Sequence, residues 1–237
     1  MKEKKNISEH QDSRVELEDL FNLYHSKQLK KAKAKGTKLI RKFPKAFILH
    51  NMLGLILSEK KEFKKAIESF QKTIKIKPDF AIAYNNLGNI YKNNGRTNLA
   101  IKYYNKSIEI NPNGPEAYNN LGNIYKSKNK LLDSIGYYKQ ALKINPKLFI
   151  VHNNLGIAYK ILGKFKEAKD CFIDSIKIKP DFYFAHRNLG LITKWKLPLE
   201  NLEKIKKNFI DLKEDTDQKR ELAFTLGKAY EDISNYD

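Results

Sequence analysis

Cysteine, arginine and long apolar runs are scarce in this sequence of 237 residues. Its one cysteine, Cys171, excludes a disulfide framework within the chain and fits a reducing compartment. No apolar run approaches the roughly 20 residues that a membrane-spanning helix needs. The first ten residues, MKEKKNISEH, also lack the apolar stretch of a signal peptide. We therefore expect a soluble, cytoplasmic protein without a membrane span.

Acidic residues are fewer than basic ones, which gives a net charge of +19. Residues 1–46 carry 13 basic and 6 acidic side chains, 47–194 carry 25 and 11, and 195–237 carry 8 and 10. Only five of the 46 basic residues are arginine, the residue best suited to bidentate reading of bases and phosphates. An AT-rich genome, whose codons favour lysine, therefore explains the charge better than nucleic-acid binding does.

Instead, the sequence has a repeat of 34 residues, marked by a Leu-Gly pair and by a proline. The pairs begin at Leu53, Leu87, Leu121, Leu155 and Leu189, and the prolines are Pro44, Pro78, Pro112, Pro146 and Pro180. A fixed period of this kind marks a supersecondary unit that is stable only when it stacks on its neighbours. Function is therefore expected on a surface shared between repeats.

The residues that keep the register resemble the tetratricopeptide repeat. In the segment 81–114 they are Tyr84, Leu87, Gly88, Tyr91, Ala100, Tyr104, Ser107 and Pro112. The resemblance implies an all-α fold, a right-handed superhelical solenoid of helix-turn-helix units. Complete repeats are expected at 47–80, 81–114, 115–148 and 149–182, a degenerate one at 13–46 and half a repeat at 183–196. Residues 1–12 are expected to be disordered, and 197–237 to form divergent helices that end in an incomplete repeat.

Helical spacing of apolar residues supports two helices per repeat. A glycine inside a helix costs about 1 kcal/mol relative to alanine, so its recurrence indicates that a neighbouring helix needs the space. We expect Gly54 and its equivalents to lie where the second helix crosses the first. The residues expected opposite them are Ala66, Ala100, Ser134 and Ala168.

In tetratricopeptide proteins the first helix of each repeat lines the concave groove, where residues at i, i+3, i+4 and i+7 share one face. Asparagine and lysine recur there. The expected peptide-binding residues are Asn85, Asn86, Asn89, Lys92, Asn119, Asn120, Asn123, Lys126, Asn153, Asn154, Lys160, Arg187, Asn188 and Lys194.

Asparagine is a poor helix former, so its recurrence within helices needs a reason. Its amide both donates and accepts, which complements an extended peptide backbone. The series resembles the asparagine ladder of O-linked N-acetylglucosamine transferase, and its mixture with lysine resembles the carboxylate clamp of chaperone-binding tetratricopeptide domains. Met52 and Ser58 interrupt these series at the N-terminal end. Alternatively, the asparagines pair between adjacent helices and the lysines are solvated.

Three histidines also recur in register, at His50, His152 and His186, but Tyr84 and Tyr118 take the same place in other repeats. This exchange favours packing of a ring over metal binding. The chain has no Gly-rich phosphate loop after a strand, no nucleophile elbow and no paired carboxylates on one face. We expect no catalysis by this chain alone, no metal and no cofactor.

The repeat register is lost after Trp195 and returns at Leu226, where the segment LGKAYED begins with a Leu-Gly pair. This ending resembles the junction in bacterial proteins that join tetratricopeptide repeats to a C-terminal sulfotransferase domain. We expect the apolar face around Leu222, Phe224 and Tyr230 to lack the covering helix that a longer chain would supply.

Together these patterns predict a non-catalytic protein-protein interaction module that binds an extended, acidic peptide or partner in its groove. Nucleic acid is not an expected partner, and the oligomeric state stays open. The alternative is the N-terminal, substrate-presenting arm of a longer sulfotransferase or of another glycan- or protein-modifying transferase.

Overall fold

The computed structural model describes residues 15–193 without a gap, together with 203, 206, 207, 209–211, 219, 220 and 222–227. Every regular element among these residues is a helix. The chain divides into an N-terminal half, residues 1–112, and a C-terminal half, residues 113–237. The predicted segment 1–12 and most of 197–237 lie outside the described residues.

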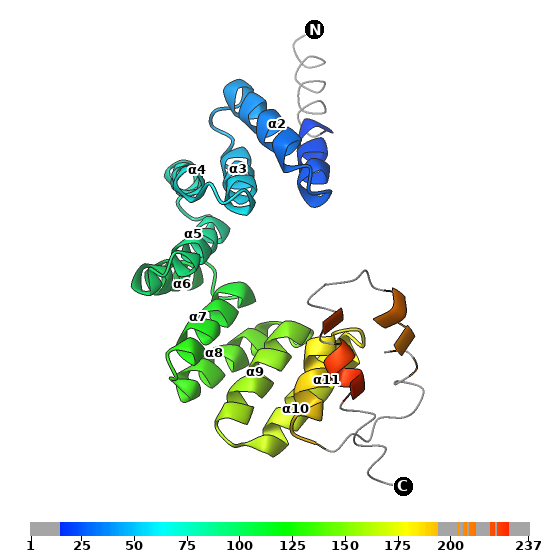
Figure 1. The fold of residues 1–237 in the computed structure, drawn as a ribbon. Helices are drawn as coiled ribbons and strands as arrows, with labels where there is room; N and C mark the ends of the chain where they lie inside the picture. The colour runs from blue at the N-terminus through cyan, green and yellow to red at the C-terminus, as the bar shows by residue number, and fades with distance from the viewer. Residues whose placement is uncertain are drawn as a thin grey trace. The chain divides into compact units, whose positions relative to one another are not determined.

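The described part of the N-terminal half begins within a helix, whose described residues are 15–25. Five further helices follow (Figure 1), namely α2 (Leu29–Lys42), α3 (Phe47–Glu59), α4 (Phe63–Ile76), α5 (Ala81–Asn93) and α6 (Thr97–Ile110). The C-terminal half contains α7 (Pro115–Ser127), α8 (Leu131–Ile144), α9 (Phe149–Ile161), α10 (Phe165–Ile178) and α11 (Tyr183–Gly190). First helices in the four complete repeats thus begin at intervals of 34 residues.

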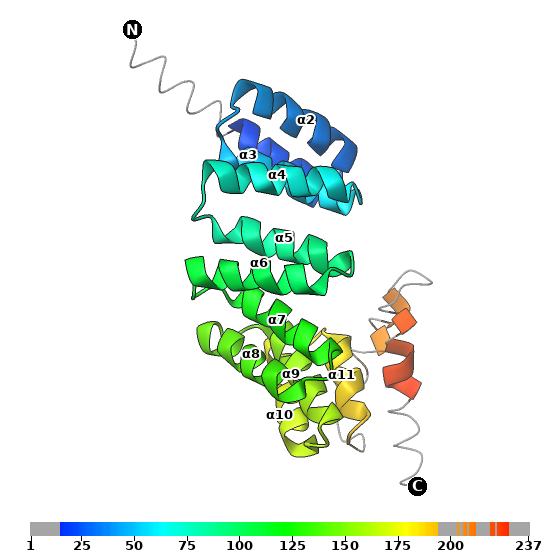
Figure 2. The ribbon, with the colours of Figure 1, turned by 90° about the vertical axis from the view of Figure 1, so that its left-hand side faces the viewer.

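Neighbouring helices pack in chain order within each half (Figure 2). The first helix of a repeat packs on the second, as α3 does on α4 and α9 on α10, and the second then packs on the next first helix, as α4 does on α5 and α8 on α9. The all-α, helix-turn-helix fold class is therefore confirmed. No strand interrupts the described part of the chain.

An aromatic ring fills the space beside the repeated glycine. A Cβ built on Gly88 would lie 2.5 Å from the Tyr104 ring, and one on Gly122 would lie 2.5 Å from the Tyr138 ring. Ser134 does approach its predicted glycine, because its Oγ donates to the Gly122 carbonyl at 2.9 Å. The ring, however, is what excludes a side chain at the glycine.

The turn inside each repeat contains a residue with positive φ at one fixed place in the register. Glycine occupies it twice, at Gly95 and Gly163, whereas Lys27, Lys61 and Asn129 adopt φ of 58°, 59° and 57°. L-residues rarely adopt this left-handed conformation. The shared turn is therefore imposed by helix packing even where the local sequence disfavours it.

Candidate functional site

Asparagines on successive first helices hydrogen-bond to one another. Each bond joins the side-chain amide nitrogen of one residue to the side-chain oxygen of another 35 positions earlier, which is one repeat plus one residue. The bonds run from Asn86 to Asn51 at 3.2 Å, from Asn154 to Asn119 at 3.1 Å and from Asn188 to Asn153 at 3.1 Å. We call this series the amide ladder. It ties neighbouring repeats together, so pairing between helices does occur.

Members of the amide ladder differ in exposure. Asn86 and Asn153 are buried, whereas Asn119, Asn154 and Asn188 are partly exposed. Burial of a polar amide is costly unless it is hydrogen-bonded, so the pairing accounts for the buried members. The partly exposed members are the ones that could also contact a bound molecule.

The amide ladder includes Asn51, which was not among the predicted groove residues. Asn51 is buried and accepts the bond from Asn86. It occupies the same place in its repeat as Asn85 does in the next one. That equivalence could have identified Asn51, but Met52, which breaks the Asn-Asn pair, obscured it.

A second pairing holds Asn89 and Asn123. The Tyr104 hydroxyl donates to Asn89 Oδ1 at 2.8 Å, and the Tyr138 hydroxyl donates to Asn123 Oδ1 at 2.7 Å. Both rings are fully buried, so each hydroxyl needs an acceptor nearby. In the other two complete repeats the corresponding pairs are apolar, Leu55 with Phe70 and Ile157 with Phe172.

Three predicted groove lysines, Lys92, Lys126 and Lys160, are partly buried. Desolvation lowers the pKa of each ammonium, and the nearby Arg187 guanidinium adds to this effect at Lys160. Lys160 Nζ donates to Asn188 Oδ1 at 3.1 Å. Lys126 Nζ lies 6.0 Å from the centroid of the Tyr138 ring.

None of these three lysines forms an ion pair within the described part of the chain. A partly buried ammonium without an anionic partner has lost hydration that a bound anion could replace. That these lysines bind a ligand stays a prediction. The fourth predicted lysine, Lys194, lies outside the described residues.

Arg187, a predicted groove residue on α11, is in contact with a later part of the chain. The Arg187 guanidinium carbon lies 4.9 Å from the centroid of the Phe224 ring. Leu222 is fully buried, whereas Phe224 is exposed, so the expected lack of a covering helix stays a prediction. Tyr230, the third residue of that predicted face, lies outside the described residues.

The in-register histidines do more than pack. His50, His152 and His186 each place Nε2 within 2.8–2.9 Å of the carbonyl oxygen of the proline six residues earlier. The Tyr84 hydroxyl makes the same bond to the Pro78 carbonyl at 3.0 Å. A ring with a polar tip thus completes the turn between repeats. Among the described residues, no three His, Cys, Asp or Glu side chains gather as metal ligands would.

The cysteine thiol is unsuited to nucleophilic chemistry. Cys171 is partly buried and packs beside the hydrophobic cluster of α8 and α9. Burial, with a smaller contribution from Asp174, raises its pKa to about 12. The thiolate is the reactive form, so Cys171 stays protonated near neutral pH.

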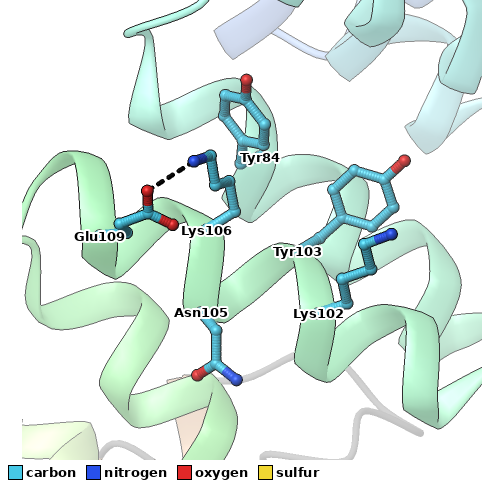
Figure 3. Close-up of a pocket in the computed structure, with 6 residues that line it drawn as sticks. All are labelled: Tyr84, Lys102, Tyr103, Asn105, Lys106 and Glu109. Atoms are coloured by element: carbon cyan, nitrogen blue, oxygen red, sulfur yellow. Dashed lines mark hydrogen bonds and ion pairs between the residues drawn. The ribbon is translucent and has the colours of Figure 1, made fainter.

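A pocket of about 500 Å³ lies on α5 and α6, away from the amide ladder. Its walls come mostly from the second helix, and the Lys106 ammonium pairs with Glu109 at 2.6 Å at its edge (Figure 3). The lining residues are Tyr84, Lys102, Tyr103, Asn105, Lys106 and Glu109. Because none of them is a predicted groove residue, the pocket is separate from the candidate face.

Models of known families match the repeats directly. One tetratricopeptide-repeat model matches residues 81–113 and 149–182, and a second one matches residues 103–135. A third model, described as a TPR repeat, matches residues 54–95 and 122–163. Together they cover 54–182 without a gap, which is more than half of the chain. The chain belongs to the tetratricopeptide-repeat family. A search of curated protein sequences gave no match.

Solved tetratricopeptide-repeat structures resemble this chain in fold. YrrB, described as a protein with an unusual peptide-binding site, is 21% identical with a TM-score of 0.53, over 77% of this chain and 94% of YrrB. MamA from Desulfovibrio magneticus RS-1 is 17% identical with a TM-score of 0.58, over 72% and 96%. The Cut9–Hcn1 structure is 18% identical with a TM-score of 0.72, over 90% of this chain and 43% of that one.

These matches support repeats and a protein-interaction role, and they give no support to the sulfotransferase junction. That resemblance rests on the segment LGKAYED, and most of this segment, residues 228–232, lies outside the described residues. Among the described helices, none combines the length and the apolar character needed to cross a bilayer.

Proposed function

We propose that the polar face of the first helices binds an extended, acidic segment of a partner protein. The observation that carries this proposal is the pair of partly buried lysines without carboxylate partners in the C-terminal half, Lys126 and Lys160, with Lys92 at the equivalent place in a repeat of the N-terminal half. Their placement beside the amide ladder puts cationic groups and backbone-complementary amides on the same helices. The peptide-binding site described for YrrB supports this class of function for the fold.

The asparagines have bonding capacity beyond the amide ladder. The bond from Asn154 to Asn119 uses one N–H of the first and one lone pair of the second. A side-chain amide has two N–H donors and an oxygen with two lone pairs. Asn119 can therefore still donate and Asn154 can still accept, which is what an extended backbone requires. In this role one set of residues both links the repeats and binds the ligand.

The lysines supply charge selectivity. Desolvation has already weakened the hydration of Lys126 and Lys160, so a carboxylate regains part of that loss when it binds. A charge-assisted bond at a partly buried site contributes more than one on an open surface. Acidic segments are therefore preferred over neutral segments of the same length.

The test is a titration of the full chain with a labelled twelve-residue peptide that carries Asp at every third position, and with its Asn counterpart. We expect the acidic peptide to bind at least about tenfold more tightly, and Lys126→Glu with Lys160→Glu to abolish the difference. Lys166→Glu with Lys169→Glu on α10 is the matched control, because both residues are exposed. Equal binding of both peptides, or equal loss in both variants, would refute the proposal.

A further inference from the structure

Helix α2 differs in charge from every other second helix. It contains seven Lys or Arg residues and no Asp or Glu. The corresponding helices α4, α6, α8 and α10 carry formal charges of +3, +1, +1 and 0. A lysine-rich codon bias acts on all five helices alike, so it does not explain why the charge concentrates on α2.

Three of the seven cations on α2 are neutralised at its flanks. Their partners come from the helix at 15–25 and from the residue before α4. The pairs are Lys35 with Asp19 at 2.7 Å, Lys42 with Glu16 at 3.6 Å and Lys33 with Glu62 at 2.7 Å. These carboxylates tie α2 to its neighbours and leave its outward side to the other four cations.

Lys30, Lys31, Lys38 and Arg41 form this outward side, which we call the α2 basic face. All four are exposed, and none forms an ion pair with any residue that the structure describes. At 100° per residue they fall within an arc of about 100°. On the opposite side, Ala32, Gly36 and Leu39 are buried.

The α2 basic face is not covered by the described residues of its half of the chain. Helix α2 lies at one end of the N-terminal half, and α3 and α4 lie to one side of it (Figures 1 and 2). Its buried side packs in the cluster that contains Leu20, Leu39 and Leu49. A packed core therefore holds the helix that carries the face, and the four cations extend from one side of that helix.

We propose that the α2 basic face docks on an anionic phospholipid bilayer. The only uncharged residue between its cations on the outward arc is Ala34. Reading of nucleic-acid bases favours arginine and aromatic stacking, and the peptide binding proposed for the first helices uses asparagine amides. Helix α2 contains one arginine, no aromatic residue and no asparagine. A lipid surface requires none of these, because mobile anionic headgroups can gather around each lysine.

The expected affinity follows from the number of exposed cations. Each Lys or Arg near an anionic surface strengthens binding about fivefold, so four of them give an enhancement on the order of several hundredfold. The attraction falls within a Debye length of about 8 Å at physiological salt. Binding should therefore require anionic lipid and weaken steeply as salt is added.

The experiment measures cosedimentation of the full chain with vesicles of phosphatidylcholine alone and with vesicles that contain 30% phosphatidylserine. We expect binding only to the second kind, and a loss of about 100-fold or more when Lys30, Lys31, Lys38 and Arg41 are all changed to Glu. The matched control changes Lys64, Lys72, Lys75 and Lys102 to Glu, because these four lysines are also exposed and lie on α4 and α6. It lowers the net charge by the same amount and should keep most of the binding.

Three outcomes would overturn this proposal. The first is failure of the unmodified chain to bind anionic vesicles at low salt. The second is an equal loss in the two folded variants, because binding would then depend on net charge and not on α2. The third is binding of a DNA duplex through the same four residues with no binding to vesicles, which would assign the face to nucleic acid. Circular dichroism checks that each variant is helical.

Discussion

The Tyr104 hydroxyl donates a hydrogen bond to Asn89 Oδ1 at 2.8 Å across the two helices of one repeat. Tyr138 and Asn123 repeat this pair at 2.7 Å. Where the ring is Phe70, the opposing residue is Leu55. The two positions therefore change together, polar with polar and apolar with apolar, and Asn89 serves the core as well as the candidate face.

Because the pair acts as a unit, Tyr104→Phe should destabilise the protein by about 1 kcal/mol, the usual net value of a buried hydrogen bond. The double variant Tyr104→Phe with Asn89→Leu should recover most of that loss, because it reproduces the apolar pair at Phe70 and Leu55. Urea unfolding of the two single variants and the double variant measures the coupling. Strictly additive effects would show that the two side chains are independent.

Two glycines provide a matched test of helix crossing. Gly122→Ala should destabilise by about 1–3 kcal/mol, because the new Cβ would lie 2.5 Å from the Tyr138 ring. Gly136→Ala on α8 has no atom within 4 Å of the new Cβ, so it should stabilise by about 0.5–1 kcal/mol. Thermal melts of both variants measure these changes. Melting temperatures that shift in the same direction in both variants would contradict this account.

The left-handed turn residue predicts a stabilising change. Lys61 has φ of 59°, a conformation that costs about 1 kcal/mol or more for an L-residue. Lys61→Gly should therefore raise the free energy of unfolding by up to about 1 kcal/mol. Lys60→Gly is the control, because Lys60 has φ of −76° and gains nothing from glycine. A destabilised Lys61→Gly variant would show that the turn carries no strain.

Stability should depend on pH through His186. Burial lowers the pKa of this imidazole, with a partly opposing effect from its bond to the Pro180 carbonyl. The unfolded chain therefore binds a proton at this residue more readily than the folded one. Above the unfolded pKa of about 6.5 the imidazole is neutral in both states, and the free energy of unfolding keeps its full value. As the pH drops below about 6.5, the free energy of unfolding decreases. His186→Tyr should keep the bond, as Tyr84 does, and flatten this part of the profile. Unfolding at pH 7.5 and 5.5 measures the change.

Much of the fold could be predicted from the sequence, because the 34-residue spacing of the Leu-Gly pairs and prolines can be read directly from it. Helix count, helix phase and the glycine requirement at Gly88 all follow from it. The ring that fills that space could not be predicted with the same certainty, because Ala100 and Tyr104 lie on neighbouring turns of one helix. Only the packed side-chain directions show that the Tyr104 ring faces the glycine.

The candidate site was less predictable, because its chemistry depends on contacts between repeats. Sequence position places Asn119 and Asn154 on one face, but the bond between them depends on how adjacent helices are offset by one residue. Burial of Lys126 and Lys160 likewise depends on neighbouring side chains. The pairing of Tyr104 with Asn89, which our sequence analysis missed, does leave a signal in the sequence, namely a correlated change between repeats.

The most direct test of acidic-peptide binding on the first helices is a ¹H–¹⁵N spectrum of the full chain during titration with the acidic twelve-residue peptide. The account predicts that the side-chain amide resonances of Asn119 and Asn154 shift in step with saturation, whereas those of Asn98 and Asn105 on α6 stay in place. Shifts confined to the α6 asparagines, or unchanged Asn119 and Asn154 resonances at saturation, would contradict it.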